Sequence, residues 1–136
     1  RRMNDGMGKY VASEVVKLMV QKDIKVKNSR ILVLGITFKE NCPDVRNTKA
    51  VDVIKNLDSY GIETKVLDTW AEPKEVLHEY GIKSYKEIED GELFDAIVLT
   101  VAHREFLDLD LGQYLKENSV LYDVKGILTK GVTGRL

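Results

Sequence analysis

The sequence predicts an α/β fold, an open parallel sheet of about five strands with helices on both faces and a long helix ahead of the sheet. Short apolar runs rich in β-branched residues, at residues 30–35 and 94–100, are typical of strands buried in a parallel sheet. Segments with helical spacing of apolar residues stand between such runs. Because strand and helix signals alternate, right-handed crossovers are expected to place helices on both faces.

Composition limits what this fold can do. The chain has 136 residues, 43% hydrophobic and 32% charged, which suits one compact domain with a real core. Its 21 basic and 22 acidic residues give a net charge of -1, so there is no bulk electrostatic reason to bind nucleic acid or an anionic membrane. No apolar run reaches the roughly 18 residues of a membrane span, and no signal-peptide pattern opens the chain. A single cysteine, Cys42, excludes an internal disulfide and favours a reducing, cytoplasmic location.

The first helix is expected over residues 5–22. The chain opens on Arg1 without an initiator methionine, which suggests a fragment of a longer protein. Because this helix is apolar around most of its circumference, we expect it to pack against an upstream domain or a second copy of the chain. The alternative is a helix that lies across the sheet of its own domain. The apolar positions are Met7, Tyr10, Val11, Ala12, Val15, Val16, Leu18, Met19 and Val20.

The remaining elements follow in alternation. A helix is expected over residues 47–57, with Asn47 or Thr48 as its N-cap. A helix over residues 72–80 is expected to end at Gly81, since glycine is favoured just past a helix C-terminus. The other expected elements are a second strand at 63–67, a weak third strand at 82–85, a helical turn at 86–90, a short helix at 111–117 and a last strand at 119–123.

Polar residues collect where strands of this Rossmann-like sheet end. Residues 39–46, His103 and Lys125 each follow the carboxyl end of a strand, the edge where open α/β sheets bind ligands. The first strand-to-helix connection lacks both the G-x-G-x-x-G dinucleotide fingerprint and the phosphate-loop motif. Lysine and arginine side chains would therefore have to supply the contacts to any anion.

Four motifs carry a resemblance to a known family. They are Gly-Ile-Thr-Phe-Lys-Glu-Asn-Cys-Pro-Asp-Val-Arg-Asn-Thr-Lys at residues 35–49 and the segments 2–11, 101–106 and 121–128. Together they resemble the C-terminal domain of the UDP-glucose/GDP-mannose dehydrogenase family. The first motif is similar to that of the bacterial UDP-N-acetylhexosamine 6-dehydrogenases of capsule and O-antigen synthesis.

The resemblance implies an activity and a set of partners. It implies an NAD-dependent oxidation of a UDP-sugar C6 alcohol to the uronic acid for surface polysaccharide synthesis. NAD would be held mainly by an N-terminal Rossmann domain. Residues 1–24 would be the connecting helix that builds a homodimer, and residues 25–136 the C-terminal UDP-sugar-binding domain.

The resemblance also assigns roles to individual residues. Phe38 and Lys39 match a substrate-contacting pair, Lys125 matches a basic residue that meets the nucleotide sugar, and Arg46 matches an arginine that reaches NAD across the domain cleft. Lysine offers a compact charge and arginine a planar fork, which suits these roles. The alternatives are that Lys39 and Lys125 are solvated lysines and that Arg46 pairs with Asp44 and braces the loop.

Other conspicuous residues are interpreted as structural. The family's catalytic cysteine belongs to an upstream segment, so Cys42 is expected to be a loop residue and the fragment inactive by itself. His103 is expected to orient the neighbouring loop, while Asp68 and Trp70 are expected to be structural.

Two rival classes are considered. A response-regulator receiver needs an acidic pair where this chain has Ile36 and Thr37, so that class is rejected. A non-catalytic nucleotide-binding or assembly module fits the same residues and stays open as the alternative.

Overall fold

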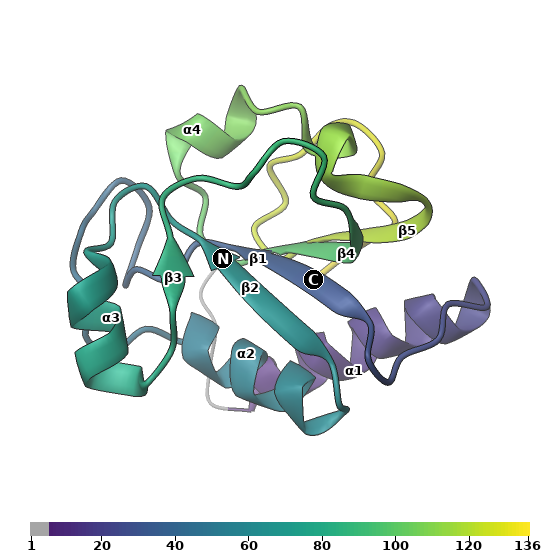
Figure 1. The fold of residues 1–136 in the computed structure, drawn as a ribbon, viewed down its shortest axis with the longest axis horizontal. Coiled ribbons are helices and arrows are strands. Elements are labelled where there is room, and N and C mark those ends of the chain that lie inside the picture. Colours follow the sequence, from purple (N-terminus) through teal and green to yellow (C-terminus); the bar gives the residue numbers. More distant parts are fainter. Residues whose placement is uncertain (1–5) are drawn as a thin grey trace.

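The computed structural model describes residues 6–136, and six strands within them form one parallel sheet (Figure 1). Every hydrogen-bonded pair of neighbouring strands is parallel, and the order across the sheet is β3-β2-β1-β4-β5-β6. This is the doubly wound order, in which the direction of winding reverses between β1 and β4. The strands are β1 Arg30–Leu34, β2 Glu63–Leu67, β3 Ser84–Tyr85, β4 Phe94–Leu99, β5 Leu115–Asp123 and β6 Gly134–Arg135.

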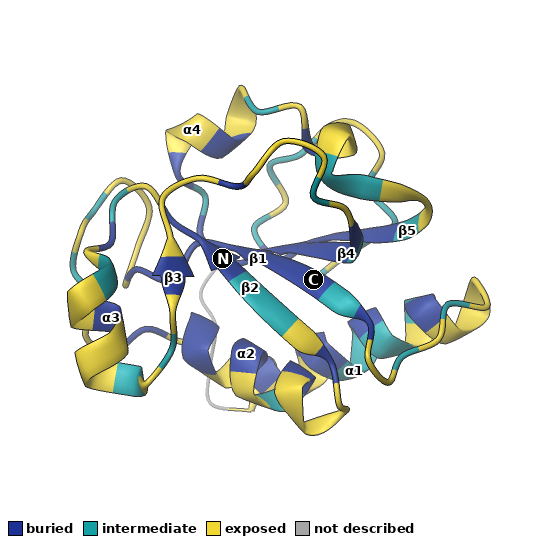
Figure 2. Cartoon of the chain, viewed as in Figure 1, coloured by how far each residue is buried: buried dark blue, intermediate teal, exposed yellow. Residues whose placement is uncertain are grey.

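The central strand β1 is apolar on both sides because both faces of the sheet are covered (Figure 2). Ile31 and Val33 belong to the core on one face, and Leu32 and Leu34 to the core on the other. Successive residues of a strand point to opposite faces, so a continuous apolar run fills two cores at once. This confirms the predicted buried parallel strand.

Helices cover both faces, as predicted. Helices α1 and α2 lie side by side against one face, and α4, the 3-10 helix η1 and the chain after β5 lie over the other (Figure 1). No helix within residues 6–136 has the length and apolar character needed to cross a membrane. The helices are α1 Met7–Gln21, α2 Ala50–Ser59, α3 Pro73–Tyr80, α4 Arg104–Leu107 and η1 Leu111–Tyr114.

Helix α1 packs on the sheet of its own domain, as the alternative interpretation of the sequence expects. Val11, Val15 and Met19 are completely buried in the core that α1 shares with α2 and the sheet. Tyr10 and Val20 on its outer side remain 50% and 59% exposed. A second contact of α1, with an upstream domain or another copy, stays a prediction. The expected helix start at Asp5 lies outside the described residues.

The start of α2 differs from the sequence prediction. The helix begins at Ala50 rather than near residue 47, and its N-cap residue is Lys49. Asn47 adopts a left-handed backbone with φ of 56°, which does not continue into a right-handed helix. The Thr48 hydroxyl accepts a hydrogen bond from the Ala50 N–H at 3.2 Å, so Thr48 still satisfies a backbone donor of the first turn.

Three other predictions are wrong in detail, and one short strand is absent from the prediction. Residues 86–90 form a loop instead of a helical turn, since a segment this short gains too few helical hydrogen bonds to offset nucleation, and Ile88 is buried in the core. The helix expected at residues 111–117 is the shorter η1, and β5 then begins at Leu115 rather than at residue 119. The short sixth strand was missed, since two residues carry no periodicity to detect.

Tyr122 on β5 makes the stability of the domain depend on pH in the alkaline range. Burial, with smaller effects from Tyr10 and Glu14, raises the pKa of Tyr122 from 10.0 to about 12. The unfolded chain then loses this proton near pH 10 while the folded chain keeps it, so stability falls as the pH rises from about 10 to 12. We expect Tyr122→Phe to remove a loss of about 1.4 kcal/mol between about pH 8 and pH 11, measured by urea unfolding. The control Tyr60→Phe, at an exposed tyrosine, should leave the alkaline loss unchanged.

Candidate functional site

The carboxyl ends of the central strands form one level edge. The register pairs Leu34 of β1 with Leu67 of β2 and Leu99 of β4, and Leu99 in turn with Asp123 of β5. The connections that leave these strands therefore start side by side. Between them, at the point where the strand order reverses, lies an open groove of about 1730 Å³. Open α/β sheets bind their ligands at this position.

All four sequence-predicted site residues line this groove. Phe38, Lys39 and Arg46 come from the connection after β1, and Lys125 comes from the connection after β5. Residues far apart in the sequence thus meet at one place, as the parallel sheet predicts. Their binding roles stay predictions.

The groove is locally basic although the chain as a whole is not. Five basic and three acidic residues are among those that line it, and so is the first turn of α2. A helix N-terminus carries partial positive charge and unpaired N–H groups, so it reinforces attraction for an anion. The charged lining residues are Lys39, Arg46, Lys49, Lys55 and Lys125 against Glu40, Asp52 and Glu79.

Phe38 and Lys39 stand on a closed turn at the rim of the groove. The Phe38 N–H donates to the Asp44 carbonyl at 2.7 Å, which joins the two sides of the connection. The Phe38 side chain is 52% exposed and Lys39 is exposed. The rim therefore carries an exposed aromatic residue and an exposed lysine at consecutive positions, a pair suited to a base or sugar ring beside a phosphate.

Arg46 pairs with Asp44 in this structure. Its Nε donates to Asp44 Oδ1 at 3.0 Å, its Nη2 donates to Oδ2 at 3.2 Å, and its side chain is 76% exposed. The side-chain hydrogen bond from Arg46 lowers the pKa of Asp44 below its usual value. An exposed ion pair is worth little, so the guanidinium can exchange this partner for a ligand at small cost. The pairing fits the bracing alternative and does not oppose the predicted contact with NAD.

Asp123, at the end of β5, positions the segment that carries Lys125. It is completely buried, and its carboxylate accepts hydrogen bonds from the N–H groups of Lys125, Gly126 and Leu128 at 2.9, 2.8 and 2.7 Å. These bonds curl the chain just past the strand and hold Lys125 at the groove. Sequence reasoning missed this residue, although a carboxylate directly before a Val-Lys-Gly turn was the available signal.

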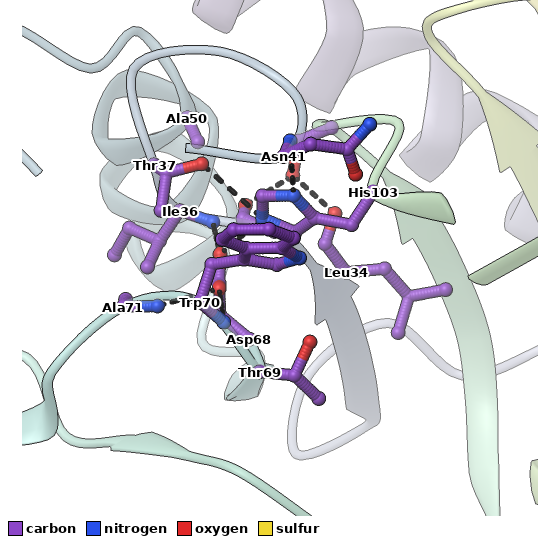
Figure 3. A network of polar contacts seen from close by, with 12 residues as sticks. Leu34, Ile36, Thr37, Asn41, Ala50, Asp68, Thr69, Trp70, Ala71 and His103 are labelled. Carbon is purple, nitrogen blue, oxygen red and sulfur yellow. Dashed lines mark hydrogen bonds and ion pairs between the residues drawn. The ribbon is translucent and has the colours of Figure 1, made fainter. Parts of the chain in front are cut away.

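A second buried carboxylate lies at the end of β2. Asp68 Oδ2 accepts from the Ile36 N–H at 2.7 Å and lies 2.9 Å from His103 Nε2, and both side chains have no exposed surface (Figure 3). Its other oxygen accepts from the N–H groups of Trp70 and Ala71 at 2.8 and 2.9 Å. Burial acts to raise the pKa of Asp68, but the hydrogen bonds from His103 and Ile36 outweigh it and hold the pKa below 3.8. Asp68 is therefore a structural hub, as expected from the sequence.

Trp70 covers this hub from outside. Its ring stacks on that of His103 with 6.1 Å between centroids, and its Nε1 donates to the Glu105 carboxylate at 2.8 Å. The Arg104 guanidinium lies 5.1 Å from the centroid of the same ring. The arrangement seals His103 from solvent and supports the structural role expected for Trp70.

Cys42 lies half-buried in the connection after β1 as a free thiol. Within residues 6–136, no group of three or more His, Cys, Asp or Glu residues is placed to hold a metal ion. Cys42 is not among the residues that line the groove. Its structural interpretation stays a prediction.

A doubly wound sheet with a basic groove at its switch point is an arrangement that many nucleotide-binding α/β domains share. The sequence model of the UDP-glucose/GDP-mannose dehydrogenase family, UDP binding domain, matches residues 32–130. This chain belongs to that family, as the sequence motifs indicate.

Relatives agree with this assignment, and a solved structure shares the fold. The chain is 43% identical over 131 residues to a UDP-N-acetyl-D-glucosamine 6-dehydrogenase of Salmonella typhi, covering 94% of this chain and 31% of the relative. It is 45% identical over 131 residues to the enzyme of the same name from Pseudomonas aeruginosa, with the same coverage. The chain therefore spans less than a third of the length of these relatives. The crystal structure of NDP-N-acetyl-D-galactosaminuronic acid dehydrogenase from Methanosarcina mazei Go1 shares the fold, with a TM-score of 0.81, 21% identity, and coverage of 93% of this chain and 26% of that one.

Proposed function

We propose that this chain is the UDP-sugar-binding domain of an NAD-dependent UDP-sugar 6-dehydrogenase. The observation that carries the proposal is the meeting of Phe38, Lys39 and Lys125 with the first turn of α2 around one groove. A UDP-sugar needs an anion site for its diphosphate and an apolar surface for a ring. The groove offers both, in a chain whose family model is a UDP binding domain.

Different side chains would contact different parts of the ligand. Lys39 and Lys125 would contact the diphosphate or sugar hydroxyls, and Phe38 would pack against a ring of the ligand. The substrate is proposed to be a UDP-N-acetylhexosamine, because the relatives described above are UDP-N-acetyl-D-glucosamine 6-dehydrogenases. The product would be a uronic acid used for surface polysaccharide.

NAD fits this chain as a ligand held mainly by another part of the protein. The connection after β1 extends over residues 35–49 before α2 begins, so it is not the tight glycine turn that holds a dinucleotide pyrophosphate. Arg46 at the rim would reach NAD from across the domain cleft. The chemistry supplied by NAD would be hydride acceptance, one hydride for each of two NAD molecules, as the C6 alcohol and one water become a carboxylate and three protons are released. The nucleophilic cysteine would also come from outside this chain.

The fragment by itself would be inactive, and the complete enzyme would work in the cytoplasm, where NAD and UDP-sugars are made. Helix α1, with Tyr10 and Val20 exposed on its outer side, would contribute to a homodimer.

The test of the proposed activity is NADH formation by the native-length protein. UDP-N-acetylglucosamine, UDP-N-acetylgalactosamine, UDP-N-acetylmannosamine and UDP-glucose are offered in parallel. We expect two NADH for each sugar oxidised, with an N-acetylated sugar preferred. A folded protein that reduces no NAD with any of them would support the alternative, a non-catalytic nucleotide-binding or assembly module.

Substitutions at Arg46 and Asp44 test cofactor binding separately from substrate binding. We expect Arg46→Ala in the native-length protein to raise the KM for NAD about tenfold, since one charge-assisted hydrogen bond is lost, and to leave the dissociation constant of UDP unchanged. Asp44→Asn is the matched control, because it removes the ion pair but keeps the guanidinium, and it should leave the KM for NAD near wild type. Equal NAD kinetics in all three proteins would show that Arg46 only braces the loop.

A further inference from the structure

We propose that Asp68, His103 and Thr37 are positioning residues that hold the turn carrying Phe38 and Lys39 in its binding geometry. This inference rests on the proposed function, because it names the residues through which the groove is set for a UDP-sugar. It concerns a buried network of which one member, Thr37, lines the groove and the other two lie behind it. Asp68 and His103 do not line the groove, so they can affect a ligand by way of the turn.

Side chains of the network contact the turn on both sides of Lys39. On one side, the Thr37 hydroxyl donates to the Lys39 carbonyl at 2.9 Å and lies 3.2 Å from His103 Nε2. On the other side, the Asn41 N–H donates to His103 Nδ1 at 3.0 Å (Figure 3). One imidazole ring therefore fixes the chain before and after the residue predicted to bind substrate.

The hydrogen-bond pattern sets the tautomer of His103. Nδ1 accepts a hydrogen bond from Asn41, so it carries no proton, and Nε2–H faces Asp68 Oδ2 at 2.9 Å. The oxygen of Asp68 that orients the ring also accepts from the Ile36 N–H, which lies at the start of the same connection. Asp68 thus bonds the His103 ring and, at Ile36, the connection that this ring also contacts.

The conformation of the turn explains why it needs such support. Asn41 adopts a left-handed backbone with φ of 55°, which is uncommon for residues other than glycine, although asparagine adopts it more readily than most. Its side chain accepts a hydrogen bond from the Arg104 N–H at 2.9 Å, so the turn is also tied to the first residue of α4. An exposed turn with an uncommon backbone conformation persists where surrounding contacts fix it. The three buried side chains supply those contacts.

Two substitutions at His103 separate the effects of losing each of its two hydrogen bonds. The amide of glutamine lies near the place of Nε2, so His103→Gln keeps the donor to Asp68 and loses the acceptor for Asn41. The shorter asparagine amide lies near the place of Nδ1, so His103→Asn keeps the acceptor and loses the donor. Thr37→Val has nearly the same shape as wild type and removes the hydroxyl that reaches the Lys39 carbonyl. Thr64→Val is the matched control, since the Thr64 hydroxyl donates to Asp58 at the opposite edge of the sheet.

The first measurement is amide hydrogen exchange of the native-length protein without ligand. We expect residues 36–41 to exchange at least about tenfold faster in His103→Gln and Thr37→Val, and at the wild-type rate in Thr64→Val. The Asn41 amide should be faster in His103→Gln than in His103→Asn, a difference that a general loss of stability does not produce. Unchanged exchange in Thr37→Val, with the fold intact, would overturn the proposal. This variant keeps the test decisive if the histidine variants fail to fold.

The second measurement is UDP affinity by titration calorimetry on the same proteins. We expect the dissociation constant to rise about tenfold in His103→Gln, whose side chain lies outside the lining of the groove, and to stay at the wild-type value in Thr64→Val. Thr37→Val should show a similar rise, but Thr37 lines the groove, so the histidine variant is the one that separates positioning from direct contact. Faster exchange of the turn with wild-type affinity would overturn the link between positioning and substrate binding. Failure of the wild-type protein to bind UDP would instead refute the proposed function, and the exchange data would still decide whether the network holds the turn.

Discussion

Lys39→Ala is expected to weaken UDP-sugar binding by about 10- to 100-fold in the native-length protein. The ammonium group is exposed at the rim of the groove, and a hydrogen bond to a charged group contributes about 1.5 to 3 kcal/mol. The Lys39 backbone, which Thr37 holds through its carbonyl, is unchanged by the substitution. The stability of the protein should therefore stay near wild type. The measurements are the dissociation constant of UDP and the KM for the preferred UDP-sugar.

Lys74→Ala is the matched control for this substitution. Lys74 is also exposed but lies on α3 outside the groove, and alanine is well tolerated in a helix. Its UDP affinity should equal that of the wild type. If Lys39→Ala also binds UDP with wild-type affinity, Lys39 is a solvated lysine and its assigned role is refuted.

Gly35→Ala is expected to destabilise the domain by about 4 kcal/mol, the largest stability effect among these predictions. Gly35 has φ of 99°, and a Cβ added there would lie 2.4 Å from the Cβ of Val101 and 3.0 Å from its Cα. Strain in a left-handed backbone and overpacking against a neighbouring chain segment each cost about 1 to 3 kcal/mol. The two connections that flank the groove meet at this contact, so UDP binding should also weaken. Urea unfolding followed by circular dichroism gives the free energy of unfolding.

Gly91→Ala separates backbone strain from the steric clash. Gly91 has φ of 83°, and an added Cβ would meet nothing within 4 Å. The strain by itself should then cost about 1 kcal/mol. A loss at Gly35 no greater than the loss at Gly91 would show that the two connections do not pack as tightly as the structure indicates.

The central strands could be predicted because their signal is local. The run at β1 is apolar on both faces, and its residues divide between the two cores as a buried parallel strand requires. Gly81 ends α3 with φ of 68°, as a C-terminal glycine is expected to do. The meeting of Lys39 and Lys125 also followed from the sequence, since parallel strands bring their carboxyl ends to one edge.

The network beneath the groove could not be predicted in its detail. Asp68 and His103 are 35 residues apart, and their pairing depends on the register that sets the ends of β2 and β4 level with β1. The sequence indicated that His103 orients a loop but not which atoms it holds. The pairing of Arg46 with Asp44 appeared as one alternative, because two neighbouring opposite charges do not themselves decide between an ion pair and a ligand contact.

The most direct test of the central claim is a crystal structure of the native-length protein with UDP bound. The account predicts UDP in the groove between the connections that follow β1, β4 and β5. Lys39 Nζ and Lys125 Nζ should lie within hydrogen-bond distance of the diphosphate or ribose, with the Phe38 ring against the ligand. UDP bound elsewhere on the protein, with this groove empty, would contradict the assignment.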